Sequence, residues 1–204
     1  MSKITLPEIA KTYHDLNDRL QKNELGPEEL FAKIQHVVLG ISRMLNLINS
    51  GHRLSTSASN TTGNSQEPDR LTMDIMLRVM RMGFIETISR IEFYSKKQLK
   101  ESKQSFFARL QEKQNQGKRI YFSNIIEDAV DADKISKEDK KFWDYILHIR
   151  NCLVHNGGIS DKDLETRIGE LEVKKDKKIE GVIMDFYLVT EKPIELYSQL
   201  LKIF

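Results

Sequence analysis

The chain contains little of several residue types, and each scarcity excludes a class of protein. A single cysteine, Cys152, among 204 residues excludes an intramolecular disulfide, a cysteine-only zinc site and a CxxC redox pair. Four prolines and ten glycines are few for this length, which favours long helices over many short strands. No apolar run approaches the roughly 20 residues of a membrane span or forms a secretory signal. We therefore expect a cytoplasmic protein that makes no membrane contact.

Neither positively nor negatively charged residues are in large excess. The 32 Lys and Arg residues against 30 Asp and Glu residues leave a formal net charge of +2, so any site for a polyanion must be local. The sequence also lacks a Walker loop and the GxGxxG, GxSxG and HExxH motifs. His148 and His155 lie about two helical turns apart, too far to share a metal ion. The sequence thus predicts neither a metal site nor a cofactor.

Apolar residues recur at helical spacing over most of the chain. Residues 52–68 interrupt this pattern with the polar run STSASNTTGNSQ and are expected to form a flexible loop. The region around Ile120–Ile126 has no clear periodicity. The periodicity predicts helices over Leu6–Leu20, Pro27–Ile48, Asp69–Lys100, Phe106–Gln114 and Lys137–His155.

After Gly158 the apolar residues alternate with polar ones, which is the pattern of strands. A first strand around Leu171–Val173, a polar turn at 175–178 and a return strand over 182–188 predict a β-hairpin. A final short helix is expected to begin at Pro193. The predicted fold is mainly α: an antiparallel helical bundle over residues 1–158, with the hairpin and last helix as an appendage of the same domain over 159–204.

The predicted helix Lys137–His155 carries two apolar stripes. One is expected to face the core and contains Phe142, Ile146, Ile149 and Leu153. A second stripe beside Arg150 contains Trp143, Leu147 and Val154. A second apolar face indicates a further partner, either another helix of this chain or a second subunit. We interpret it as the contact of a homodimer.

The end of this helix holds the polar residues with the most evident chemistry. Asn151 and His155 are four residues apart and therefore neighbours on the helix surface. The helix C-terminus favours a charged imidazole at His155, which suits a proton donor or a phosphate contact. Arg150 needs an acid, a phosphate or water as its partner. In the alternative interpretation Arg150 pairs with an acid and His155 only caps the helix.

The run Arg150-Asn151-Cys152-Leu153-Val154-His155, followed by Asn156-Gly157-Gly158, resembles the Arg-polar-x-x-x-His motif of the HEPN superfamily. The predicted helix from Phe84 to Lys100 is similar to the partner helix of that bundle, and the resemblance covers roughly residues 69–158. It implies a helical bundle that dimerises so that two copies of the motif face one another. Catalytic members cut RNA there without a metal, and others are only binding or dimerisation modules.

The resemblance implies a role for each motif residue. Arg150 would hold a phosphate, His155 would act as general acid or base, and Asn151 would orient His155 or the substrate. On an ideal helix Arg150 and His155 diverge by about 140°, so two copies across a dyad are needed to converge on one phosphate. The residues expected to bind substrate are His148, Lys141 and Asn156.

These expectations together predict a homodimeric, metal-independent endoribonuclease that cleaves RNA by attack of the 2′-hydroxyl, in bacterial or phage defence. An antitoxin or other regulatory protein is a partner that the resemblance allows. The alternative is a catalytically inactive HEPN-like module that binds RNA, a nucleotide or a protein and dimerises, because a fold does not secure a function.

Overall fold

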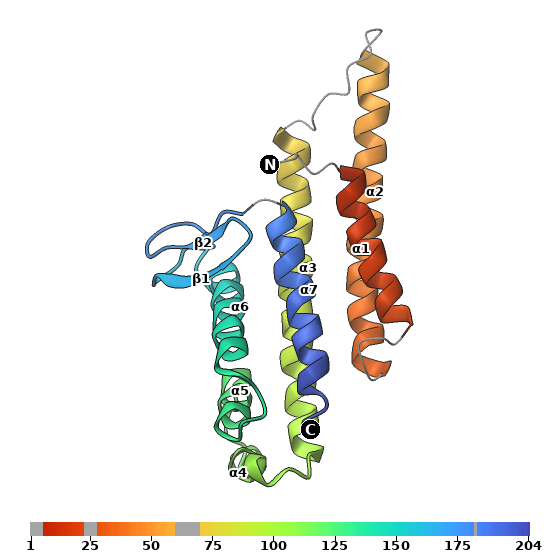
Figure 1. The fold of residues 1–204 in the computed structure, drawn as a ribbon. Coiled ribbons are helices and arrows are strands. Elements are labelled where there is room, and N and C mark those ends of the chain that lie inside the picture. The colour runs from red at the N-terminus through yellow and green to blue at the C-terminus, as the bar shows by residue number, and fades with distance from the viewer. Residues whose placement is uncertain (1–5, 23–27, 60–69, 182) are drawn as a thin grey trace.

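The structure, a computed structural model, describes residues 6–22, 28–59, 70–181 and 183–204. These residues form seven α-helices, one short 3-10 helix and a two-stranded antiparallel sheet (Figure 1). The mainly helical fold with a small hairpin and a final helix is therefore confirmed. The elements are α1 (Leu6–Gln21), α2 (Glu28–Ser59), α3 (Arg70–Glu101), η1 (Ser105–Phe107), α4 (Ala108–Asn115), α5 (Phe122–Asp131), α6 (Lys137–His155), β1 (Leu164–Ile168), β2 (Leu171–Val173) and α7 (Ile183–Leu200).

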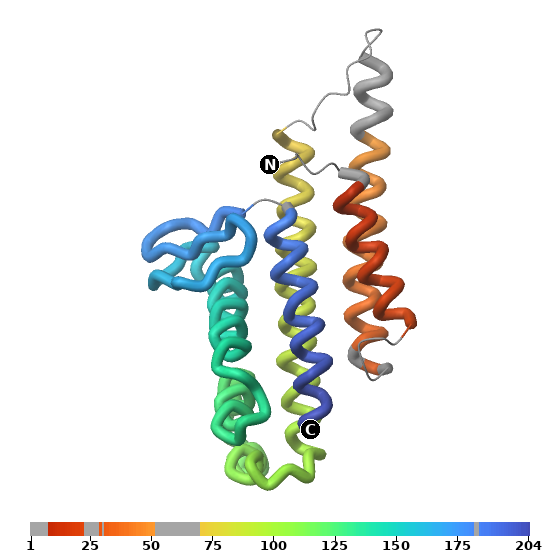
Figure 2. The backbone as a smooth tube through the Cα atoms, viewed as in Figure 1, coloured from red at the N-terminus to blue at the C-terminus, as the bar shows by residue number. Residues whose placement is uncertain are grey.

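The long helices lie side by side in three pairs (Figures 1 and 2). Helices α1 and α2 run antiparallel on one side, α3 and α7 occupy the middle, and α6 with α5 lies on the other side of α3. The hairpin β1–β2 lies at the C-terminal end of α6. Helix α3 contacts α2, α5, α6 and α7, so it is the central element around which the others pack.

The core is mainly aliphatic and includes several large aromatic side chains, because each helix buries one stripe of apolar residues. The largest side chains that are fully buried are Trp143, Tyr13, Tyr145, Tyr197, Phe31, Phe84, Phe107, Phe122 and Phe186. Helices α2 and α3 approach closely at Gly83, where an added Cβ would collide with the side chain of Ile41. A glycine at this position lets the two long helices pack against each other.

Ion pairs and hydrogen bonds join the first helix to the last. The Arg19 guanidinium in α1 donates to the carboxylates of Glu191, at 3.0 Å, and Glu195, at 2.9 Å. The Tyr187 hydroxyl donates to Glu191 over 2.8 Å. The Arg19 contacts hold α7 against α1, and α7 also packs against α3.

Helix α2 is longer than its sequence predicts. It continues to Ser59, so the expectation of a loop beginning at residue 52 is wrong as far as residue 59. The composition of that run is polar but contains no proline, and helix α2 extends through it. The rest of the expected loop, residues 60–68, lies outside the described residues, as does Pro27.

The hairpin is present, but its strands lie earlier in the chain than expected. Strand β1 pairs with β2 in antiparallel register, with Leu164 opposite Val173 and Ile168 opposite Leu171. The expected return strand over 182–188 is wrong, because residues from Ile183 onward are helical. Pro193 consequently lies inside α7 rather than at its start. Packing against the bundle makes this segment a helix, because its buried residues recur at helical spacing: Phe186, Val189, Ile194 and Tyr197.

Helix α6 begins and ends where the sequence predicts. The Ser136 hydroxyl accepts from the backbone N–H of Asp139 over 3.0 Å and caps the first turn. Gly157 and Gly158 adopt positive φ angles of 61° and 83°, and the N–H of Gly158 donates to the Cys152 carbonyl over 2.9 Å. Glycine tolerates this left-handed backbone, which ends the helix directly after His155.

Candidate functional site

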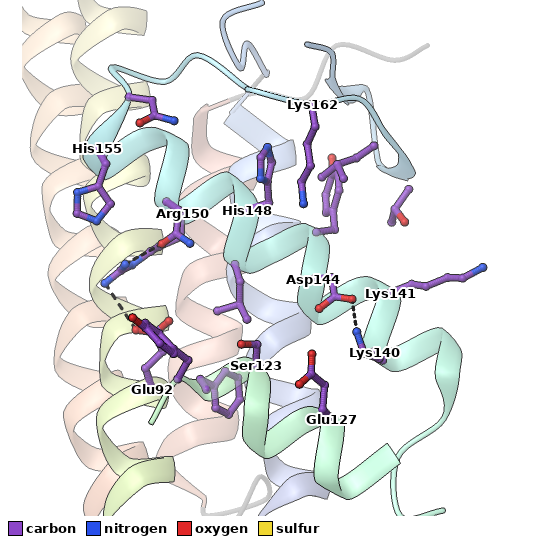
Figure 3. A pocket seen from close by; sticks show the side chains of 18 of the residues that line it. Glu92, Ser123, Glu127, Lys140, Lys141, Asp144, His148, Arg150, His155 and Lys162 are labelled. Carbon is purple, nitrogen blue, oxygen red and sulfur yellow. Dashed lines mark hydrogen bonds and ion pairs between the residues drawn. The ribbon is translucent and has the colours of Figure 1, made fainter. Parts of the chain in front are cut away.

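A pocket of about 1250 Å³ opens along α6, and its walls come from α3, the start of α5 and the segment that leads into β1 (Figure 3). All six residues that the sequence singles out line this pocket: Arg150, Asn151, His155, His148, Lys141 and Asn156. Four of them fall within the last two and a half turns of α6, Asn156 follows the helix directly, and Lys141 lies near its first turn. The structure thus brings the candidate site residues into one cavity.

Arg150 reaches from α6 towards α3. Its Nη1 donates to the Asn151 Oδ1 over 2.9 Å, and its Nη2 donates to the Ser89 Oγ over 3.3 Å. The same Nη2 lies 3.6 Å from the Glu92 Oε2, and Figure 3 shows the guanidinium directed at this carboxylate. The side chains of Arg150 and Glu92 are 19% and 22% exposed. Arg150 is therefore held in a fixed position at the pocket wall.

The guanidinium of Arg150 is not fully satisfied by these contacts. Its Nε is shielded from water and has no hydrogen-bond partner in the described part of the chain. A buried N–H without an acceptor is unfavourable by roughly 1–3 kcal/mol. The contacts that the described residues make with Arg150 therefore leave one guanidinium donor unsatisfied.

His155 and Asn156 lie at the mouth of the pocket, where α6 ends. Both side chains are exposed, and so is Asn151. His155 is the last helical residue, so its side chain lies in the final turn, at the negative end of the helix dipole. The exposed His155 side chain is accessible to a ligand bound in the pocket.

Lys141 lies at the opposite end of the pocket from the motif. Figure 3 shows its side chain extending away from Arg150. Nine residues separate the two, which corresponds to about 13 Å along the helix. Its neighbour Lys140 is neutralised by Asp144 at 2.6 Å. Lys141 is thus placed to contact a different part of an extended ligand than Arg150 does.

The charge of the pocket lining is mixed. The lining contains six Lys and Arg residues and five Asp and Glu residues. Among the described residues, four of these cations have no carboxylate within ion-pair distance: Lys96, Arg119, Lys141 and Lys162. Arg119 instead packs over the ring of Tyr121, 4.9 Å from its centre. The pocket therefore offers separate positive points rather than a continuous basic surface.

His148 occupies the pocket wall as a largely buried side chain. Its Nε2 lies 2.7 Å from the Ser160 Oγ, 3.4 Å from the Cys152 Sγ and 3.7 Å from the Asp161 Oδ1. Burial lowers the pKa of His148, nearby Lys162 lowers it further, and Asp161 opposes both. Burial likewise raises the pKa of the Cys152 thiol. Both groups are therefore neutral at pH 7, and His148 is a weak candidate for holding a phosphate by charge.

Three residues that contact the candidate site lie in segments that the sequence pattern does not connect to the motif. Ser89 and Glu92 of α3 contact Arg150 from about 60 residues away. Asp161 approaches His148 from the loop after α6. The helical spacing of His148 and Cys152, four residues apart, was the one available signal for this last group.

The second apolar stripe of α6 is mostly covered by the chain itself. Trp143 is buried, with its ring edge-on to that of Phe122 in α5 and 5.0 Å between ring centres. Leu147 is also buried, and only Val154 is exposed, at 43%. The expectation that this stripe forms a dimer contact is therefore wrong, because α5, whose periodicity was not clear, packs against it.

Comparison of the chain with models of protein families, with curated proteins and with solved structures gave no match. Among the described residues, no helix combines the length and the apolar character that crossing a bilayer requires.

Proposed function

We propose that the protein is a homodimeric, metal-independent endoribonuclease of the HEPN type. One observation carries this proposal: Arg150, Asn151 and His155 line the same pocket, with Arg150 bonded to Asn151 and His155 exposed at the pocket mouth. These are the residue types that phosphoryl transfer from RNA needs, namely a fixed guanidinium and a titratable imidazole. The proposed enzyme acts in the cytoplasm, in bacterial or phage defence.

The reaction needs two proton transfers and one site for negative charge. The 2′-oxygen of RNA attacks the adjacent phosphorus as its proton leaves, and the bond from phosphorus to the 5′-oxygen breaks as that oxygen gains a proton. Arg150 binds the phosphate oxygens on which charge develops. His155 either takes the proton of the 2′-hydroxyl or gives a proton to the 5′-oxygen, and water exchanges the other proton. The products are a 2′,3′-cyclic phosphate and a 5′-hydroxyl.

A second copy of the chain is part of the proposed site, because Arg150 and His155 diverge around α6. The covered stripe of α6 is not available for this contact, but α3 offers another. Its exposed apolar residues share one helix face with Ser89, the acceptor of Arg150: Leu71, Ile75, Met82 and Phe93. Met82 is 70% and Phe93 is 65% exposed. A dimer through this face would bury an apolar stripe that shares its helix face with Ser89, the acceptor of Arg150.

The Glu92 contact favours a second candidate function. A carboxylate 3.6 Å from Arg150 competes with a phosphate for the same guanidinium. A module that binds RNA, a nucleotide or a protein through the unpaired lysines of the pocket, without cleaving, would leave the Arg150–Glu92 contact intact. The two functions differ in whether RNA is cut.

The deciding experiment incubates the purified protein with total RNA in excess chelator and analyses the fragment ends. The proposed enzyme yields discrete fragments with 2′,3′-cyclic phosphate and 5′-hydroxyl ends and leaves DNA intact, because DNA lacks the attacking hydroxyl. His14→Ala is a matched control, since His14 is an exposed histidine of α1 outside the pocket lining. RNA that is bound but remains uncut supports the binding module, and RNA that is neither bound nor cut excludes the nuclease and an RNA-binding module.

A further inference from the structure

We propose that His148, Cys152 and Asp161 form a binding site for a divalent transition metal ion, with Zn²⁺ as the ion that the ligands suit best. Each side chain offers one ligand atom, and these three atoms all lie within 4.8 Å of one another. The set combines an imidazole nitrogen, a thiol sulfur and a carboxylate oxygen, which are the ligands that Zn²⁺ takes in proteins. This inference is independent of the proposed nuclease activity.

The distances already approach those of a coordinated ion. Bond lengths of about 2.0 Å to nitrogen or oxygen and 2.3 Å to sulfur place tetrahedral ligands about 3.3 to 3.5 Å apart. The His148 Nε2 lies 3.4 Å from the Cys152 Sγ and 3.7 Å from the Asp161 Oδ1. Two of the three ligand pairs therefore need almost no adjustment.

The local structure explains why two of the ligand side chains are held in place and the third can move towards the ion. His148 and Cys152 are four residues apart on α6, so the helix directs both side chains to the same side. The His148 side chain is 10% exposed and Cys152 is buried. The Asp161 side chain is 74% exposed and moves towards the ion without loss of packing. Solvent around Asp161 can supply the fourth ligand.

Binding changes the protonation of one ligand. The buried thiol of Cys152 loses its proton to solvent when sulfur bonds to the metal, and His148 binds in the neutral form that its surroundings favour. Because the Ser160 hydroxyl donates to the Lys162 carbonyl, it accepts its 2.7 Å hydrogen bond from a protonated His148 Nε2. Metal binding therefore replaces this bond and requires the neutral tautomer of His148 in which the proton has moved, by way of solvent, from Nε2 to Nδ1. Ser160 keeps its bonds with the backbone of Lys162, at 2.6 Å to the carbonyl and 3.3 Å from the N–H.

The position of the site indicates a structural role. Asp161 belongs to the loop between α6 and β1, and the next residue, Lys162, lines the pocket. A metal ion held by α6 and by Asp161 would fix this loop against the helix. The ion would set the position of Lys162 and take no part in the cleavage step, which is assigned to Arg150 and His155.

Cobalt(II) is the probe for this site, because its spectrum reports both geometry and sulfur ligation. Metal-free full-length protein titrated with Co²⁺ should develop the intense visible bands of a tetrahedral ion and a sulfur-to-cobalt charge-transfer band, saturating at one ion per chain. Added Zn²⁺ should bleach both and raise the melting temperature. Cys152→Ser should abolish the charge-transfer band, and Asp161→Asn should weaken Co²⁺ binding by about tenfold or more.

Asp144→Asn is the matched control, because Asp144 is a half-exposed carboxylate one turn before His148 on the same helix. Binding in this variant should equal that of the parent. Asp161→Asn keeps the test valid if Cys152→Ser fails to fold, since Asp161 is exposed. The proposal is overturned if the folded parent binds no Co²⁺, if its spectrum lacks the sulfur band, or if Asp161→Asn binds as tightly as the parent.

Discussion

Replacement of Arg150 and of His155 should separate activity from stability. The two residues belong to one motif, but their surroundings differ. Arg150 makes hydrogen bonds to Asn151 and Ser89 and lies 3.6 Å from the Glu92 carboxylate, with one fifth of its side chain exposed. His155 is exposed, and its side chain makes no hydrogen bond or ion pair within the described residues.

The expected magnitudes follow from these contacts. A hydrogen bond contributes about 0.5–1.5 kcal/mol net, so Arg150→Ala should lower the free energy of unfolding by roughly 1–3 kcal/mol. For a chain of this size each kcal/mol corresponds to about 2–4 °C in melting temperature. His155→Ala should change the free energy of unfolding by less than about 0.5 kcal/mol, as for other exposed sites. Both substitutions should reduce RNA cleavage about 100-fold or more, because each removes a group that acts on the transition state.

Thermal unfolding and a cleavage assay on one labelled RNA measure the two effects side by side. Arg150→Lys keeps the charge near Glu92 but loses the paired donors of the guanidinium, so it should regain part of the stability and little of the activity. Asn151→Ala should cost less activity than either, because Arg150 keeps its contacts with α3. Cleavage by His155→Ala within threefold of the parent would refute the role of the motif.

Four further predictions test the dimer and the fold. Met82→Glu places a charge on the exposed apolar face of α3 and should give a folded monomer in sedimentation equilibrium, with a melting temperature lowered only by the loss of the dimer contact; a dimer of parental affinity would exclude that face. Mixing the inactive Arg150→Ala and His155→Ala proteins should restore cleavage, since one of the two shared sites is then intact; no recovery despite mixed dimers would show that each subunit acts alone. Tyr145→Phe removes the 2.8 Å hydrogen bond to the Leu171 carbonyl and should cost about 1–3 kcal/mol in urea unfolding, because it leaves a buried acceptor unpaired. Ser136→Ala should cost about 1 kcal/mol by thermal unfolding through loss of the α6 cap, whereas Ser136→Asp should retain most of the stability.

The part of the fold that the sequence predicts well is the part that local signals determine. Helix α6 has a serine at its start, glycines with positive φ at its end and helical periodicity between them, so both of its boundaries agree with the structure. The run 182–188 has no such signal. Its apolar residues at every second position suit a strand, and only the packing of Phe186 and Val189 against the bundle decides for a helix.

The candidate site is likewise predicted from the sequence only where its residues lie on one helix. The six predicted residues share a pocket because all of them lie on or directly after one helix, whose geometry the sequence implies. Glu92 and Asp161 come from other elements, and a single sequence does not indicate which helix faces which. The sequence also predicts that the second apolar stripe of α6 packs against a partner. That partner is α5 of the same chain and not a second subunit.

The arrangement of α7 has a consequence for how the protein is made. Helix α7 lies between elements that precede it by up to 180 residues: the ring of Phe186 lies against Arg81 of α3, and Glu191 and Glu195 bind Arg19 of α1. At translation rates of about 5–20 residues per second, several seconds pass between the synthesis of α3 and the synthesis of α7. During that interval the α7-facing side of α3 is open to water and to chaperones. All of the pocket residues are therefore synthesised before α7. Only when α7 packs against α3 does the bundle become complete, and α3 then holds Glu92 in its final position.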